Sequence, residues 1–138
     1  MKVFYKVLSL VIVLISFGCQ NDNESNFTQD QLSREWKFVK VTGGLLGVNQ
    51  EIEPGMITWS FNSITNTVTI VNTTTDQMLY DFFETGVYNY QILESSSDFG
   101  CDEVLKIDNI ELGCLSIVDD KLVIDQTYAD GFRLELID

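Results

Sequence analysis

The feature of this sequence that most constrains its fold is a strict alternation of bulky apolar and polar side chains. Residues 57–61 read Ile-Thr-Trp-Ser-Phe, so the three apolar side chains share one face and the two hydroxyl side chains share the other. Residues 132–136 read Phe-Arg-Leu-Glu-Leu and repeat the pattern. A period of two residues is typical of a β-strand with one face in a core and the other in solvent. Both segments are therefore predicted to be half-buried strands.

Short segments of this kind follow one another at regular spacing. Turn-forming pairs such as Asp119-Asp120 and Asp130-Gly131 separate the later ones. Only a short helical turn is expected, at residues 28–31, because no long segment has helical periodicity. The sequence predicts an all-β fold, a small antiparallel up-and-down barrel of about eight strands, with a β-sandwich as the alternative. The other predicted strands are 36–41, 67–71, 79–83, 87–93, 104–107, 113–118 and 122–124.

The beginning of the chain has the pattern of a targeting segment and not the alternation of the predicted strands. Lys2 and Lys6 make a cationic start, and residues 7–17 then form an apolar run that ends at Gly18-Cys19. The run is too short to cross a bilayer, which takes about 20 residues. A cationic start, a short apolar run and a small residue in this order are typical of a secretory signal. A buried apolar strand is the alternative.

The end of the apolar run, residues 14–19 (Leu-Ile-Ser-Phe-Gly-Cys), resembles the lipobox of bacterial lipoproteins. In that family the cysteine thiol is acylated, for example with palmitate, and the chain is cut just before the cysteine. The resemblance implies a signal peptide at 1–18, lipid attachment at Cys19 and a lipidated tether at 19–28. Residues 29–138 are then the folded domain, and an ordinary signal peptide is the alternative.

Residues 20–24 (Gln-Asn-Asp-Asn-Glu) resemble the acidic export tag of surface-exposed lipoproteins of the Bacteroidetes group. The resemblance implies an outer-membrane protein, lipid-anchored and exposed at the cell surface. The alternative is a polar tether that carries no localisation signal. A segment of this composition cannot bury enough apolar surface to fold.

Charge and the absence of histidine narrow the function classes. The chain has 21 acidic and 8 basic residues and a net charge of −13, so it offers no basic face for nucleic acid. Membrane attachment is expected through the acyl chains alone. The lack of histidine excludes Ser-His and Cys-His catalysis and the usual zinc sites. Acidic residues lie close together at several places, for example Glu51 and Glu53, but their positions do not identify a catalytic pair. Asp119-Asp120 lacks the ligand spacing of an EF-hand calcium loop. We therefore expect no enzyme, no cofactor and no metal site.

Two cysteines remain after Cys19. Cys101 and Cys114 lie thirteen positions apart in a chain that is predicted to be exported. An oxidising compartment favours a disulfide between them, with two buried thiols or a reactive cysteine as alternatives.

Several of the predicted strands resemble those of the lipocalin-like lipoproteins, in the same order. Residues 32–39 (Leu-Ser-Arg-Glu-Trp-Lys-Phe-Val) look like the opening of that family, in which a turn after leucine leads to a tryptophan on the first strand. Arg34 stands where the family usually has glycine. Later matches are at 57–62, 86–90, 122–125 and 130–136.

This resemblance implies a barrel that binds a small apolar molecule. Aromatic side chains on the inward faces of the strands are the expected lining: Trp59, Phe61, Tyr88, Tyr90 and Phe132. The same alternation also fits a core of packed aromatic residues without a ligand. A second hypothesis is a protein-interaction or inhibitor module of the cell envelope, which would instead expose an apolar patch to a protein partner.

Overall fold

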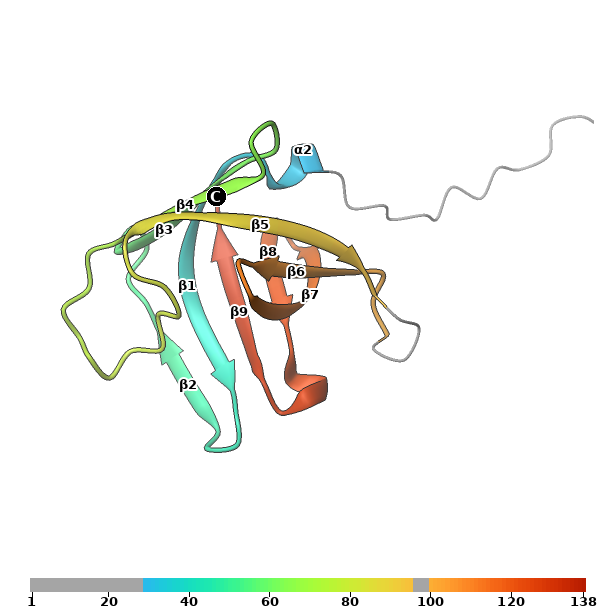
Figure 1. Ribbon diagram of the computed structural model, residues 1–138. Helices are drawn as coiled ribbons and strands as arrows, with labels where there is room; N and C mark the ends of the chain where they lie inside the picture. Colours follow the sequence, from blue (N-terminus) through green and yellow to red (C-terminus); the bar gives the residue numbers. More distant parts are fainter. Residues whose placement is uncertain (1–28, 96–99) are drawn as a thin grey trace, which may run out of the picture.

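The structure, a computed structural model, describes residues 29–95 and 100–138 (Figure 1). The predicted signal peptide at 1–18, the lipid-attachment residue Cys19 and the tether at 19–28 lie outside the described residues. Within the described part, no helix is long and apolar enough to cross a membrane.

The described residues form nine strands and two short helical turns, α2 (Gln29–Leu32) and η3 (Thr127–Ala129). The strands are β1 (Glu35–Gly43), β2 (Val48–Glu51), β3 (Ile57–Asn62), β4 (Thr67–Asn72), β5 (Gly86–Glu94), β6 (Glu103–Ile107), β7 (Ile110–Val118), β8 (Lys121–Asp125) and β9 (Phe132–Ile137).

Every strand pairing is antiparallel, and the sheet closes on itself. The order is β2-β1-β3-β4-β5-β6-β7-β8-β9, and β1 also pairs with β9. Eight strands form the closed barrel, while β2 is an additional strand that pairs with the second half of β1. The predicted barrel is thus confirmed, and the sandwich alternative is wrong. The alternating segments 57–61 and 132–136 are strands β3 and β9.

One predicted strand was wrong, and one observed strand was not predicted. Residues 79–83 form part of the loop between β4 and β5. Phe82 has a φ of 63°, which no strand residue adopts, and the Phe83 N–H donates to the Asp81 carbonyl two residues back. Conversely, Val48–Glu51 forms β2, which the sequence did not indicate because this edge strand lies outside the barrel and has no apolar alternation.

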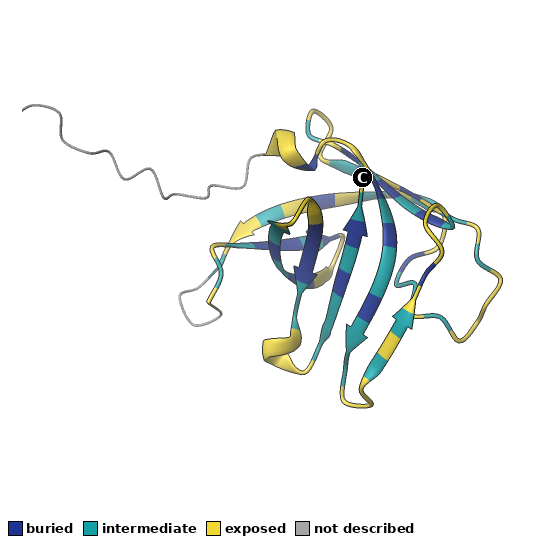
Figure 2. Ribbon diagram, turned by 180° about the vertical axis from the view of Figure 1, so that it is seen from behind, coloured by how far each residue is buried: buried dark blue, intermediate teal, exposed yellow. Residues whose placement is uncertain are grey.

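Apolar side chains on the inward faces of the strands fill the barrel. Cross-strand pairs such as Trp36 with Trp59 and Phe38 with Leu136 bring fully buried side chains opposite one another. Figure 2 shows the resulting alternation of buried and more exposed positions along the strands. Burial of apolar surface of this kind is the main favourable contribution to folding.

The turn before β1 closes one end of the barrel. Leu32 is fully buried, and the Trp36 Nε1–H donates to the Leu32 carbonyl at 3.1 Å. The Arg34 guanidinium lies 5.0 Å from the centre of the Trp36 ring and forms a 2.8 Å ion pair with Asp138. Its Nε–H donates to the Gln31 carbonyl at 3.2 Å. Arg34 therefore ties this turn to Asp138, which follows β9.

A disulfide joins Cys101 and Cys114, as predicted, with an S–S distance of 2.05 Å and a Cα–Cα distance of 5.9 Å. It connects the segment before β6 to the middle of β7. Because Cys114 also pairs with Val104 of β6 in the sheet, the disulfide braces strands that already lie side by side. Neither cysteine is therefore a free thiol.

Candidate functional site

Three of the five predicted lining residues lie deep in the barrel. Trp59 and Phe61 are on β3, Tyr90 is on β5, and all three are buried. The rings of Trp59 and Phe61 lie 6.3 Å apart, and those of Phe61 and Tyr90 meet edge to face at 5.2 Å. Such edge-to-face contacts are favourable beyond simple burial, by about 0.5–1.5 kcal/mol per pair.

The other two predicted residues, Tyr88 and Phe132, are half-buried. Both contact the loop between β4 and β5, at the end of the barrel opposite α2. The ring of Phe83 lies 5.2 Å from Tyr88 and 5.7 Å from Trp59, and the ring of Phe82 lies 5.3 Å from Phe132. The structure therefore brings all five predicted residues into one connected aromatic cluster.

Phe82 and Phe83 were not among the predicted site residues, although they connect the two halves of the cluster. We call Leu79–Phe83, with its two adjacent aromatic side chains, the aromatic plug. The sequence did contain a signal for it, because neighbouring residues of a strand face opposite sides and cannot both enter one core. Phe38 was also missed; its ring lies 6.0 Å from Trp59 and 6.4 Å from Phe82.

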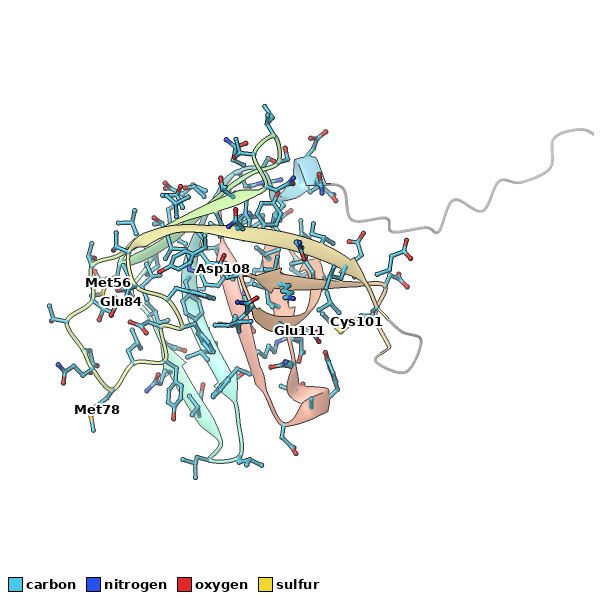
Figure 3. All side chains as sticks on the ribbon, in the orientation of Figure 1. Met56, Met78, Glu84, Cys101, Asp108 and Glu111 are labelled. Atoms are coloured by element: carbon cyan, nitrogen blue, oxygen red, sulfur yellow. A yellow bond between two sulfur atoms is a disulfide. The ribbon has the colours of Figure 1, made fainter. Side chains whose placement is uncertain are left out.

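Side-chain hydrogen bonds hold the loop that carries the plug. Asn72 Nδ2 of β4 donates to Asp81 Oδ2 at 2.7 Å and to the Phe83 carbonyl at 3.0 Å. Gln50 of β2 accepts from the Tyr80 N–H and donates to the Met78 carbonyl, both at 3.0 Å. Figure 3 shows Met78 at the outer end of this loop. The extra strand β2 thus has a role, since it supports the plug from outside the barrel.

Two polar atoms of the cluster are buried without a hydrogen-bond partner among the described residues. They are Trp59 Nε1, on a side chain with no exposed surface, and Tyr90 Oη. Burial raises the pKa of Tyr90, so its hydroxyl keeps its proton. An unpartnered buried donor costs about 1–3 kcal/mol. The interior therefore offers two donors to a molecule that carries an acceptor atom and an apolar body.

The carboxyl groups whose pKa is shifted lie outside the aromatic cluster. Burial raises the pKa of Glu103, and the neighbouring Asp102 raises it further; Glu103 Oε2 is buried without a partner among the described residues. Burial alone would also raise the pKa of Asp125, but hydrogen bonds from Thr127 and the Arg133 guanidinium outweigh it and lower that pKa. The described residues contain no group of three or more His, Cys, Asp or Glu side chains that could hold a metal ion.

Comparison with protein-family models, with curated proteins and with solved structures found no match to this chain.

Proposed function

We propose that this protein is a lipocalin-like lipoprotein of the outer membrane that binds a small apolar molecule inside its barrel and does no catalysis. The observation that carries the proposal is the aromatic cluster together with its two unpartnered donors, Trp59 Nε1 and Tyr90 Oη. An apolar molecule with acceptor atoms placed against these donors would satisfy them and replace aromatic contacts with contacts of its own. A pocket of mostly apolar walls with a few placed polar groups is the usual form of a small-molecule site.

The ligand would enter the barrel at the aromatic plug. Phe82 and Phe83 occupy the end of the barrel between Trp59 and Phe132, so a ligand enters by displacing them. Phe82 is held at a φ of 63°, a conformation that costs a bulky residue about 1–3 kcal/mol. Displacement of the plug releases this strain, which offsets part of the aromatic packing that is lost.

The proposed location rests on the sequence. A secretory signal, a lipobox cysteine at position 19 and an acidic segment after it support anchoring by acyl chains, with the barrel at the cell surface. Two or three acyl chains suffice for a lasting anchor, whereas one binds marginally. Because the protein has a net charge of −13, electrostatic attraction to anionic lipid contributes little to membrane attachment.

A binding titration tests the proposal. The exported protein is titrated with a dansyl-labelled fatty acid, and the dansyl emission is followed. Tyr90→Phe keeps the ring and removes the hydroxyl, so we expect it to weaken binding by about 2- to 12-fold, the effect of one hydrogen bond. Tyr128→Phe, on the half-exposed η3 turn, is the matched control and should bind as the unaltered protein does. Absence of dansyl enhancement in the unaltered protein would refute interior binding.

One observation favours the second candidate function, a protein-interaction module. Leu45 and Leu46 are adjacent at the tip between β1 and β2, and 87% and 89% of their respective surfaces are exposed. Two exposed leucines are a plausible anchor for a protein partner. If Leu45→Ser with Leu46→Ser abolishes capture of a partner from the envelope while fatty-acid binding is absent, this second function replaces the first.

A further inference from the structure

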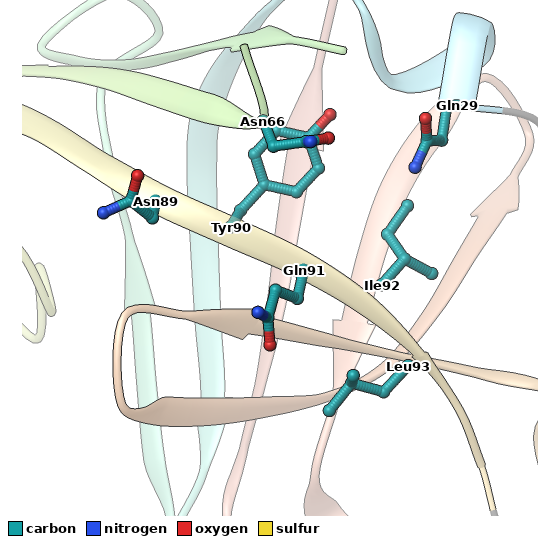
Figure 4. Close-up of a pocket in the computed structure, with 7 residues that line it drawn as sticks. All are labelled: Gln29, Asn66, Asn89, Tyr90, Gln91, Ile92 and Leu93. Atoms are coloured by element: carbon teal, nitrogen blue, oxygen red, sulfur yellow. The ribbon is translucent and has the colours of Figure 1, made fainter. Parts of the chain in front are cut away.

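A pocket lies on the outside of the barrel, at the end closed by α2. Its volume is about 530 Å³, and it runs along β5 between α2 and the turn that precedes β4 (Figure 4). Its lining combines carboxamide side chains with one aromatic and two aliphatic residues: Gln29, Asn66, Asn89, Gln91, Tyr90, Ile92 and Leu93. The aromatic cluster shares only Tyr90 with it, and the Tyr90 hydroxyl has no accessible surface there.

The described residues that line the pocket include no charged side chain. This is a marked departure from the rest of a chain in which 21% of the residues are charged. An ion in this pocket would meet no side chain of opposite charge among the described lining residues. The ligand that this lining suits is therefore neutral.

The four carboxamide side chains come from three separate segments of the chain, and their donors and acceptors are free of bonds to other described residues. None of these side chains makes a hydrogen bond to another described residue, whereas those of Asn72, Gln50 and Asn62 do. Asn72 and Gln50 anchor the plug loop, and Asn62 Oδ1 accepts two backbone N–H groups in the turn after β3. A carboxamide both donates and accepts, so the four supply hydrogen-bond donors and acceptors on both sides of β5.

The edge of β5 adds backbone groups to this set. The Asn89 N–H and carbonyl face β6, where they bond to Asp108, and the Tyr90 N–H donates to the Asn66 carbonyl on the opposite side. By the alternation of strand hydrogen bonds, the N–H and carbonyl of Ile92 face the same side as the Tyr90 N–H. No strand pairs with Ile92 there within the described residues, because β4 pairs only with Gly86 to Asn89.

The pocket also wraps around this free edge. In Figure 4 Ile92 points from β5 toward Gln29, while Gln91 and Leu93 point to the other side of the strand. A ligand here meets polar groups on both sides of the edge and aliphatic surface from Ile92 and Leu93. An added peptide strand would use the backbone edge but leave the carboxamides on the outer face unused.

From this arrangement we infer that the pocket is a binding site for a neutral oligosaccharide. Sugar hydroxyls donate and accept, as carboxamides do, and the C–H faces of a sugar ring pack on aliphatic side chains. The site is separate from the barrel interior and does not depend on a ligand there.

The test is calorimetric titration of the exported protein with neutral tetrasaccharides of glucose, mannose, galactose and N-acetylglucosamine. Sialylated and sulfated glycans and an uncharged peptide are titrated alongside. We expect at least one neutral tetrasaccharide to bind. Gln91→Ala and Asn66→Ala should each raise its dissociation constant by about 2- to 12-fold, the effect of one neutral hydrogen bond.

Asn49→Ala is the matched control, because Asn49 is an exposed carboxamide on strand β2, outside the pocket. It should leave the dissociation constant unchanged. The inference is overturned if no neutral tetrasaccharide binds, if only charged glycans or the peptide bind, or if Asn49→Ala weakens binding as much as Gln91→Ala.

Discussion

Replacing both Cys101 and Cys114 with serine should destabilise the barrel by about 3 kcal/mol. The disulfide closes a loop between residues thirteen positions apart. The disulfide keeps this loop closed in the unfolded chain as well, which lowers the entropy of the unfolded chain by about 10 cal/mol/K. At 25 °C this corresponds to about 3 kcal/mol of stabilisation. Because Cys114 keeps its sheet pairing with Val104, the double variant should still fold into the same barrel.

Urea unfolding followed by tryptophan emission measures this difference. With a urea dependence of roughly 2 kcal/mol/M for a domain of this size, the midpoint of the double variant should fall by roughly 1.5 M. Dithiothreitol is the control, since it should lower the midpoint of the unaltered protein and leave that of the variant unchanged. A midpoint shift below about 0.3 M would show that the loop is already restricted in the unfolded chain and refute the entropic reasoning.

Four further predictions follow from the anchor and from individual contacts. Cys19→Ala should leave the protein uncut or free of the membrane fraction, and a fully processed, membrane-bound variant would contradict the lipid assignment. Arg34→Ala removes contacts that close one end of the barrel and should lower the unfolding free energy by about 1–2 kcal/mol in urea titrations; no change would mean that solvent screens them. Glu103 has a pKa above its ordinary 4.5, so its contribution to stability is lost as pH rises. Glu103→Gln should therefore be more stable than the unaltered protein at pH 7 and no more stable at pH 3; equal stability at both would contradict this. The pKa values of Asp125 and Glu135 are held below their ordinary 3.8 and 4.5, because their partners outweigh burial. The stability that they contribute should fall as the pH drops below about 4.5, in thermal melts against pH, and a flat profile from pH 5 to 2 would contradict it.

The alternation of side chains was enough to predict the barrel and most of its strands. Residues 57–61 and 132–136 each have one apolar face, and only a β-strand puts that face into a core. The disulfide was also predictable, because the predicted export to an oxidising compartment favours oxidation of two cysteines that are close in sequence. In each case a local pattern corresponds to a local physical cause.

What could not be predicted depends on long-range contacts. The segment 79–83 has the composition of a strand, yet hydrogen bonds to Asn72 and to Gln50 hold it as a loop with Phe82 at positive φ. Gln50 lies thirty positions before Tyr80, so its contact leaves no local pattern in the sequence. The role of Arg34 depends on Asp138, at the other end of the described domain. The carboxamide pocket was not predicted because its lining residues come from three separate segments, and none of these segments contains a recognisable sequence motif.

Native mass spectrometry of the exported protein tests the central claim, interior binding of an apolar molecule, most directly. We predict extra mass that organic solvent removes, or that appears when a fatty acid is added and is reduced in Tyr90→Phe. A clean mass that no apolar compound changes, in a protein with its disulfide intact, would contradict the claim.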